Sequence, residues 1–540
     1  MSWTARLVFA AALAGVSGVW PFLTGREPAS IVIVTGQEAT APVPTLIEDG
    51  QTTLANQDVA DQLFLRLADV GPGMVTAGDQ GFVPRLARSW TRRDSLTLVF
   101  DLDPRARWHD GAPVTSRDVL FTLRRARDTA IAPRLANVTR RIAAVEVESE
   151  HRVVFRFREV YAEQFYDATY HAAIVPAHLL EEQPATTESW AKFAARPIGS
   201  GPYRWVRRQR GEFIELAAVE NFFLGEPAIK RVIVRVAVDA DARLNLLLSG
   251  EADATENIPP PLSNIERVTA AEHLRVVPVP SSNLGYLLFN HRDPAHPDRP
   301  HPVLADRDVR RALILALDRP LLVRAVLGRY GEVPFGPASS QLWIHHGAPT
   351  PARQDQATAR RLLAGRGWVD RDQDGVRENR SGVPLALNLL VTTSSQQRRQ
   401  MALMIQQQLR EVGVKLDLIR LEPSVWGERR NKGKFDIDFS AAIQDPSPSG
   451  LAGSWTCEGP GNVGHYCDRG ADSLLFRALA SPTADRRLWH AFLQQVEDAA
   501  PAAFLYTQIY VSGVNRRFPE VIIRPVSVWS SLWRWPAPRS

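Results

Sequence analysis

Two patterns of hydrophobic and polar positions recur along the chain. Where apolar residues alternate with other residues, as in Leu96–Leu102, the pattern predicts a half-buried strand. Where they lie three or four positions apart, as Val59, Leu63 and Leu67 do, it predicts a helix with one buried face. The predicted strands are Ile31–Val34, Leu96–Leu102, Val153–Phe157, Tyr203–Arg207, Phe213–Ala217, Ile229–Val236, Leu284–Phe289, Val414–Leu418 and Ala503–Tyr510.

Helices are predicted between these strands. Thr115 and Asp118 have the spacing of a capping box, so a helix should begin directly after Thr115. Asp306 is a candidate N-cap for one long helical region, and Pro84–Trp90 is expected to form a turn with a short element. The other predicted helices are Asn56–Ala68, Ala240–Leu248, Gln396–Val412 and Leu488–Val496. Because strands and helices alternate throughout, we predict an α/β fold.

The composition is that of a globular protein. The 540 residues are 45% hydrophobic and 23% charged, which excludes a mostly disordered chain, a fibre or a multi-span membrane protein. A chain of this length is expected to form about three domains or two large lobes. The net charge of +5 comes almost entirely from arginine interleaved with acidic residues, so no nucleic-acid partner is predicted.

The N-terminus has the pattern of an export signal. One arginine precedes an apolar stretch from Leu7 to Leu23, so residues 1–26 are predicted to direct the chain to the periplasm. No cysteine follows the stretch, which argues against a lipoprotein anchor. Trp20 and Pro21 interrupt the small-residue pattern of a cleavage site, and an uncleaved N-terminal anchor is therefore the alternative.

The chain has two cysteines, Cys457 and Cys467, in one loop-like stretch. Two thiols do not complete a tetrahedral zinc site even with His465 as a third ligand, and their spacing is not that of a Cys-x-x-Cys redox motif. In an oxidising compartment they would form a local disulfide, and in the cytosol two free thiols. The export signal favours the disulfide.

The sequence contains no recognisable catalytic or cofactor motif. A nucleophile elbow, a His-Glu-x-x-His helix, a Walker loop and a complete dinucleotide fingerprint are all absent. Asp370, Asp372, Asp374 and Gly375 match the first half of a calcium loop, but its twelfth position is Ser381 instead of glutamate. We therefore expect a tight turn with solvated acids there, and no metal, no cofactor and no enzymatic activity.

Five regions carry further motifs in a fixed order. They are PRLARSW (84–90), LTLVFDLDPRARWHDGAPVTSRDVLFTLRRARD (96–128), PIGSGPYRW (197–205), YLLFNHR with DRDVRRALILALDR (286–292 and 306–319), and LLAGRGWVDRDQDGVRENRSGVPLALNLL (362–390). In this order they resemble the extracytoplasmic solute-binding proteins of family 5, the oligopeptide/dipeptide/nickel-binding type that serves ABC importers. The resemblance covers about residues 55–535.

The resemblance implies a two-lobe fold of the periplasmic-binding-protein type II kind with an extra inserted domain. Its parts would be domain I (27–69, 196–280 and 511–540), the inserted domain II (70–195) and domain III (281–510). The chain would cross between domains I and III near residues 280 and 511. Ligand would bind between these two domains, and their closure would bury it.

The resemblance also implies where ligand would bind. In peptide-binding relatives an aspartate before an Asp/Glu-Pro step holds the α-amino group, but the aligned residue here is Ala442, and only Asp445 remains nearby. A ligand without an amine, or one anchored differently, is therefore expected. The same loop of dipeptide-type relatives carries a cysteine pair, which supports the disulfide. The candidate ligand-binding residues are Gln37, Asn283, Tyr286, Trp426, Gln444, Asp445, Trp455, Asn462 and His465.

The expected function is that of a monomeric periplasmic protein that delivers a peptide or peptide-like solute to the permease subunits of an ABC transporter. Two alternatives stay open at this point. One is a periplasmic hydrolase on the same scaffold, which a nucleophile–base pair in the cleft would mark. The other is a membrane-anchored sensor or chaperone-like binder, which an uncleaved N-terminal segment would mark.

Overall fold

The computed structural model describes residues 29–44, 54–128, 135–136, 139–183, 187–524 and 527–539. The predicted signal segment, residues 1–26, lies outside the described residues. Among the described helices, none combines the length and the apolar character that crossing a membrane requires.

One large mixed sheet runs through the molecule. Its strands are β1 (Ser30–Thr35), β8 (Tyr203–Gln209), β9 (Phe213–Ala218), β10 (Arg231–Val236), β11 (Ala254–Thr255), β12 (Leu274–Phe289), β13 (Gly331–Glu332), β14 (Ala386–Thr392), β15 (Lys415–Leu421), β16 (Ile437–Ile443) and β17 (Ala502–Asn515). They run in the order β15-β14-β16-β12-β17-β11-β1-β10-β9-β8, and β13 pairs with β17.

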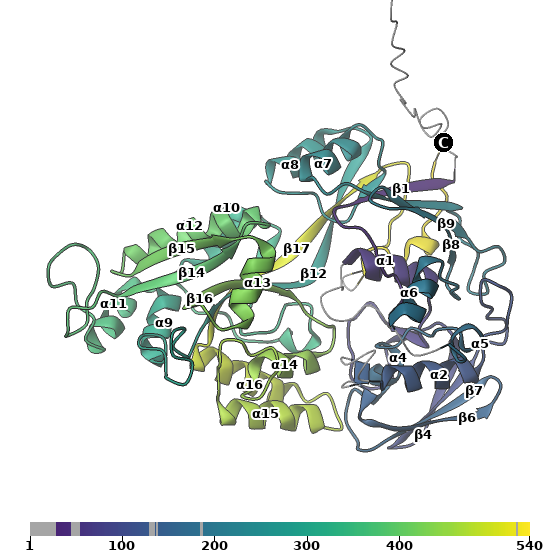
Figure 1. Cartoon of the computed structure of the whole chain (residues 1–540), viewed down its shortest axis with the longest axis horizontal. Coiled ribbons are helices and arrows are strands. Elements are labelled where there is room, and N and C mark those ends of the chain that lie inside the picture. Colours follow the sequence, from purple (N-terminus) through teal and green to yellow (C-terminus); the bar gives the residue numbers. More distant parts are fainter. Residues whose placement is uncertain are drawn as a thin grey trace, which may run out of the picture.

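The long antiparallel strands β12 and β17 connect two lobes (Figure 1). At one end β17 pairs with β11, and at the other β12 pairs with β16. We call the part with β1 and β8–β11 the N-terminal lobe and the part with β14–β16 the C-terminal lobe. The ladder between β12 and β17 shifts register between Pro280 and Leu284. Periodicity predicted only Leu284–Phe289 of β12, because the preceding stretch contains prolines, which are unusual inside a strand.

A second, four-stranded sheet belongs to the N-terminal lobe. Its strands are β4 (Ala87–Asp94), β5 (Thr97–Leu102), β6 (Ile142–Ser149) and β7 (Arg152–Phe157), in the order β4-β5-β7-β6, and a short pair, β2 (Ala68–Val70) and β3 (Phe82–Pro84), lies before it in the chain. The turn and short element expected at Pro84–Trp90 are the bend at residues 85–86 and the start of β4, although β4 runs on to Asp94. This strand is mostly exposed, so its sequence has no apolar alternation that would have identified it.

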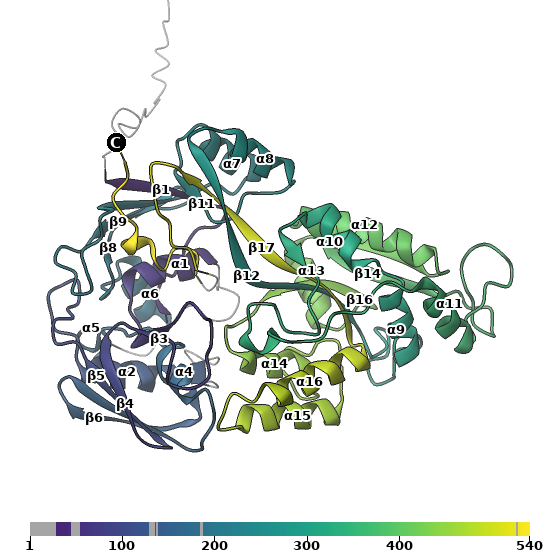
Figure 2. The same ribbon diagram turned by 180° about the vertical axis from the view of Figure 1, so that it is seen from behind.

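Helices flank these sheets (Figure 2). They are α1 (Leu54–Leu63), α2 (Ser116–Ala126), α4 (Gln164–Thr169), α5 (Ala177–Leu180), α6 (Thr187–Ala195), α7 (Ala240–Leu248), α8 (Ser263–Ala270), α9 (Arg307–Leu315), α10 (Arg319–Leu327), α11 (Gln356–Gly365), α12 (Gln396–Arg410), α13 (Pro423–Asn431), α14 (Leu451–Trp455), α15 (Arg469–Ala480) and α16 (Arg486–Ala499). The predicted capping box of Thr115 and Asp118 starts α2.

Two helix predictions need correction at their ends. The region after Asp306 is two helices, because Asp318 caps α10 and Pro320 occupies its first turn. Helix α1 ends at Leu63 instead of Ala68, and the carbonyl of Leu63 accepts a hydrogen bond from Gly201 N at 2.8 Å. The chain approaches so closely here that a Cβ at Gly199 would lie 1.8 Å from that carbonyl oxygen.

The hydrophobic core follows the lobes. One continuous cluster joins the N-terminal end of the large sheet to the small sheet. In the C-terminal lobe the sheet is covered on both faces: Leu389 of β14 packs in one cluster with α9–α12, and its neighbour Leu390 packs in another with α14–α16. Both faces of this sheet are therefore buried.

Candidate ligand cleft

Polar side chains gather where β12 and β17 cross between the lobes. Asn283 Nδ2 donates to Gln508 Oε1 at 3.2 Å, and Ser281 Oγ donates to the carbonyl oxygen of Gln508 at 2.7 Å. The phenol of Tyr510 lies beside Asn283 and Ser281, and its pKa is raised by burial and by the charge of Glu256. The polar groups at the crossing of β12 and β17 therefore lie next to a carboxylate of the N-terminal lobe.

That carboxylate belongs to a cavity under the end of β1. Thr35, Asp58, Gln62 and Glu256 line it together with apolar residues. Burial raises the pKa of Glu256 to about 7. Burial also raises the pKa of Asp58, and the charges of Glu256 and Asp61 raise it further. Two carboxyl groups therefore share a poorly solvated space next to the crossing strands.

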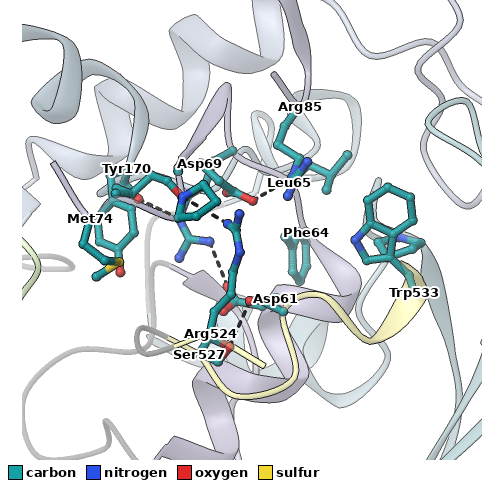
Figure 3. A pocket seen from close by; sticks show the side chains of 16 residues that line it. Asp61, Phe64, Leu65, Asp69, Met74, Arg85, Tyr170, Arg524, Ser527 and Trp533 are labelled. Atoms are coloured by element: carbon teal, nitrogen blue, oxygen red, sulfur yellow. Dashed lines mark hydrogen bonds and ion pairs between the residues drawn. The ribbon is translucent and has the colours of Figure 1, made fainter. Parts of the chain in front are cut away.

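A larger pocket lies between α1, β2 and the C-terminal segment (Figure 3). Its charged side chains have partners within the protein. Arg66 pairs with Asp61 at 2.8 Å, Arg85 pairs with Asp69 at 2.6 Å, and Arg524 donates to a backbone carbonyl at 3.0 Å. The two ion pairs neutralise charges within the lobe, and the Arg524 hydrogen bond to Val70 ties the C-terminal segment to it, so we assign the pocket a structural role.

The two lobes also touch through the region around α4. Tyr166 Oη donates to Asp445 Oδ1 at 2.5 Å, and Ser447 Oγ donates to Glu163 Oε2 at 2.5 Å. Glu163 also accepts a hydrogen bond from Thr76 Oγ1 on its own lobe. Burial raises the pKa of Glu163 to about 7. This contact is polar and contains an acid whose ionised form is disfavoured by its surroundings.

The backbone and a tryptophan extend the same contact. Ala162 N donates to the carbonyl oxygen of Ser481 at 2.9 Å, and Trp343 Nε1 donates to Thr76 Oγ1 at 3.1 Å. Figure 2 shows α4 on the side of the N-terminal lobe that faces α14–α16. In this conformation the lobes therefore meet at the hinge and again at this contact.

Three aromatic candidates from the sequence lie in the C-terminal lobe. Tyr286 and Trp455 are 6% and 3% exposed, with ring centroids 5.5 Å apart, and both pack against Phe504. Trp426 Nε1 donates to the buried carboxylate of Asp438 at 2.8 Å. Packing and hydrogen bonding within the protein account for these three rings.

The polar candidates lie in different places. Asn283 belongs to the polar group at the crossing, and Gln37 is exposed just after β1. Gln444 accepts a hydrogen bond from Ser339 N at 2.7 Å and donates to a carbonyl oxygen at 2.6 Å. Asp445 also accepts from Ser447 N at 2.9 Å, a contact within the turn after β16. Ala442 is exposed near the end of β16.

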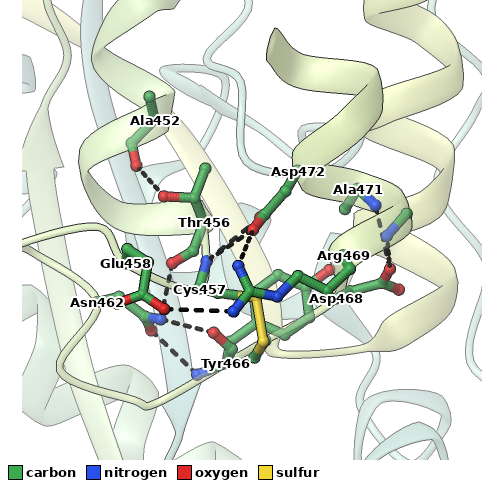
Figure 4. The surroundings of a disulfide bond; sticks show 12 residues. Ala452, Thr456, Cys457, Glu458, Asn462, Tyr466, Asp468, Arg469, Ala471 and Asp472 are labelled. Atoms are coloured by element: carbon green, nitrogen blue, oxygen red, sulfur yellow. Dashed lines mark hydrogen bonds and ion pairs between the residues drawn. A yellow bond between two sulfur atoms is a disulfide. The ribbon is translucent and has the colours of Figure 1, made fainter.

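The predicted disulfide is present, and it closes a braced loop (Figure 4). Asn462 Nδ2 donates to the carbonyl oxygens of Thr456 at 2.9 Å and Tyr466 at 2.6 Å. Cys457 N donates to Asp472 of α15, with distances of 3.2 and 3.3 Å to the two carboxylate oxygens. Asn462 therefore supports the loop itself.

His465, the last candidate, lies on the outside of the same loop. It has a positive φ of 56°, and its Nδ1 is 3.2 Å from Asn290 Oδ1. Burial lowers the pKa of its imidazole.

Sequence reasoning missed Asp58, Gln62 and Glu256. Asp58 and Gln62 lie on α1, and Glu256 follows β11, about 200 residues further along the chain. No local motif connects them, so only the fold brings them together. The spacing of Asp58 and Gln62, which places them on one helix face, was the only signal available.

The comparisons with known proteins agree with this architecture. Among curated proteins, the chain is 26% identical over 421 residues to the oligopeptide-binding protein AppA of Bacillus subtilis (strain 168), covering 77% of this chain and 75% of AppA. It is also 26% identical over 537 residues to the probable di/tripeptide-binding protein 5 of Pseudomonas aeruginosa (strain UCBPP-PA14), covering 91% and 94%.

Solved structures share the fold at low identity. The AppA structure from Bacillus subtilis in complex with a nonapeptide matches with a TM-score of 0.78 and 22% identity, covering 94% of this chain and 99% of that one. NikA from Brucella suis in complex with Fe(III)-EDTA matches with a TM-score of 0.81 and 18% identity, covering 94% and 100%. The predicted α/β, type II periplasmic-binding-protein fold is thereby confirmed.

A family model assigns the chain. Residues 81–464 match the model of bacterial extracellular solute-binding proteins, family 5 Middle. The match covers most of the chain, and it contains all five of the regions whose order suggested this family. The chain therefore belongs to family 5 of the bacterial extracellular solute-binding proteins.

Proposed function

We propose that this protein binds a peptide or peptide-like solute outside the cytoplasm and delivers it, as a monomer, to the permease subunits of an ABC transporter. The names of its curated relatives, an oligopeptide-binding protein and a di/tripeptide-binding protein, support this solute class. The observation that carries the proposal is the pair of strands β12 and β17, which crosses between two lobes and gathers polar groups at the crossing.

The proposed parts are domain I (27–69, 196–280 and 511–540), domain II (70–195) and domain III (281–510). Domain I and domain III share β12 and β17, with a register shift close to residue 280. Domain II contributes the α4 side of the second contact. The solute binds between domains I and III, and closure of the cleft covers it.

The polar residues at the crossing are the best placed of the sequence candidates to contact a solute. Asn283 lies on the crossing strand itself, and Gln37 lies at the exposed end of β1. Both can donate and accept hydrogen bonds, as recognition of a peptide backbone requires. The protein binds the solute without altering it chemically, in the periplasm, where its disulfide is stable.

The test is to identify what the protein carries. Native mass spectrometry of protein purified from its own envelope should show a bound peptide or peptide-like solute of unchanged mass. Adding that solute to ligand-free protein should lower the radius of gyration in solution scattering, because the lobes close. Recovery of a cleaved solute would favour the hydrolase, and an unchanged radius would contradict cleft closure.

A further inference from the structure

We propose that the cavity lined by Asp58, Gln62 and Glu256 binds a primary ammonium group of the solute. The proposal rests on the proposed function, because the ammonium is part of the solute that the cleft captures. It is carried by hydrogen-bond acceptors that converge on one cavity and by the lack of a cation among its lining residues.

The first observation is an amide oxygen without a donor. Gln62 is 3% exposed, and its Nε2 donates to the carbonyl oxygens of Asp58 at 3.2 Å and Trp529 at 2.9 Å. These bonds fix the orientation of the amide, and its Oε1 is left buried without a hydrogen-bond partner. Since buried polar atoms are nearly always paired in folded proteins, a donor from outside the protein is expected here.

The second observation is the pair of carboxyl groups. Asp58 lies one turn before Gln62 on α1 and accepts a hydrogen bond from Ser527 Oγ at 3.1 Å. Among the described residues no lysine, arginine or histidine forms an ion pair with Asp58 or Glu256. The other charge that acts on Asp58 is Asp61, which is itself paired with Arg66. A positive charge is therefore the group that this cavity lacks.

The cavity has the size of one small cation. The centre of a water-sized sphere can occupy about 20 Å³ of it, and a water molecule, which is close to an ammonium in size, needs at least about 10–15 Å³ on this measure. An ammonium carries three donors, which matches the three acceptor side chains. Thr35 and Glu256 are partly exposed, and Tyr510 places Glu256 next to the crossing strands, so a solute in the cleft can reach it.

This cavity would take over the role of the amino-binding aspartate that the C-terminal lobe lacks. Ala442 has no carboxylate, and Asp445 already accepts hydrogen bonds from Tyr166 and Ser447. Asp58 and Glu256 supply a negative site on the opposite lobe. The ammonium is thus held from the N-terminal lobe in this protein.

The experiment uses isosteric variants of the full-length mature protein. Asp58→Asn and Glu256→Gln remove one charge each, and Glu251→Gln is the matched control, since Glu251 is exposed and pairs with Arg235 on the surface. Thermal shifts are measured with butylamine, and with butanol as its neutral counterpart. Calorimetry compares a set of dipeptides with their N-acetylated copies.

Butylamine, and not butanol, should raise the melting temperature of the wild type and of Glu251→Gln. Asp58→Asn and Glu256→Gln should lose that shift. N-acetylation should weaken dipeptide binding to the wild type by roughly 10- to 100-fold, since it removes a charge-assisted interaction. In Asp58→Asn the free and acetylated dipeptides should bind alike. Circular dichroism checks that the variants fold, and if one does not, the other decides.

The possible failures are distinguishable. No butylamine shift, an equal shift in both variants, or a shift with Mg²⁺ or Ca²⁺ that butylamine does not compete with would overturn the ammonium site. Acetylated dipeptides that bind as tightly as free ones would overturn it too, while leaving the proposed function intact. Butylamine binding without closure on any peptide-like solute would contradict the proposed function and leave the ammonium site standing.

From an independent observation we infer, second, that the loop of residues 370–378 binds a calcium ion. Asp370, Asp372, Asp374 and Glu378 each bring a carboxylate oxygen within 4.8 Å of the others. Glu378 is 9% exposed, and its Oε1 and the Oδ1 of Asp370 are buried without a hydrogen-bond partner. The sequence predicted a turn with solvated acids because it looked for the last ligand at Ser381. The fold supplies Glu378 instead, and an all-oxygen set suits Ca²⁺.

Terbium luminescence tests this site, because Trp368 lies close enough in sequence to sensitise a bound lanthanide. We expect emission from the wild type and from Asp417→Asn, an exposed control on β15, and displacement of the signal by Ca²⁺. Asp372→Asn should lose the emission. Ca²⁺ should raise the melting temperature of the wild type but not that of Asp372→Asn. Emission that is absent, or equal in Asp372→Asn, would overturn the calcium site.

Discussion

Replacement of Glu163 by glutamine should change the pH dependence of stability and of lobe closure. Glu163 lies in the contact between the lobes, where Ser447 and Thr76 donate to its carboxylate. Burial raises its pKa from 4.5 to about 7, against the lowering effect of these two hydrogen bonds. Asp167, one turn further along α4, and Asp445, across the contact, raise it as well.

The size and sign of the effect follow from this shift. An acid whose pKa is raised by folding stabilises the folded state fully below its unfolded pKa, and the contribution is lost as the pH rises through the folded pKa. For a pKa moved from 4.5 to about 7, the loss above pH 7 is on the order of 3 kcal/mol. The glutamine variant lacks this loss, so it should be more stable than the wild type at pH 8 by up to about 3 kcal/mol and similar to it at pH 5.

The assay is thermal or denaturant unfolding of both proteins at pH 5 and pH 8, with solution scattering at the same pH values. Ionisation of Glu163 should also favour opening of the contact, so the wild type should have a larger radius of gyration at pH 8 than the variant. Glu159→Gln, at an exposed acid nearby, is the control. A stability difference between variant and wild type that is the same at both pH values would refute the reasoning.

Three further predictions concern packing and the lobe contact. Replacing both cysteines with serine should lower the free energy of unfolding by about 2–3 kcal/mol, measured by denaturant titration, because the disulfide closes a short loop; an unchanged midpoint would contradict it. In Gly285→Ala the new Cβ would lie 2.2 Å from the Tyr506 ring, so a loss of at least about 1–3 kcal/mol is expected; wild-type thermal stability would be inconsistent with this packing. Tyr166→Phe removes the donor to Asp445 and should increase the radius of gyration of the ligand-free protein, and an unchanged radius would mean that this bond does not hold the lobes.

Much of the fold could be predicted because most elements are half-buried. The helix at Ala240–Leu248 has the predicted bounds, since Asp239 caps it and its apolar positions recur with the helical period. Elements without such a pattern were missed. β4 is exposed on most of its length, and the first half of β12 contains prolines whose tolerance depends on the partner strand.

The site was harder to predict than the fold, because its groups come from distant parts of the chain. The cysteine pair could be found, since its partners are close in sequence and the compartment decides its chemistry. The aromatic residues near the expected cleft could not be separated from core residues by sequence, and Trp455 is in the core. The parallel pairing of β1 with β11 brings Glu256 to the end of β1, where it lines the same cavity as Asp58 of α1, and no local pattern encodes this meeting.

The sharing of β12 and β17 by the two lobes has a consequence for how this protein can be divided. In the described part of the chain no linker between the lobes could be cut, because both connections are strands hydrogen-bonded to each other and to neighbours in each lobe. A fragment that ends near residue 280 would lack β17, which pairs with both β11 and β12, and would expose strand edges that promote aggregation. Exchange of one lobe for that of a relative would therefore have to include both strands. Because each strand also pairs within the other lobe, a substitution in β12 or β17 has to be compatible with the packing of both lobes.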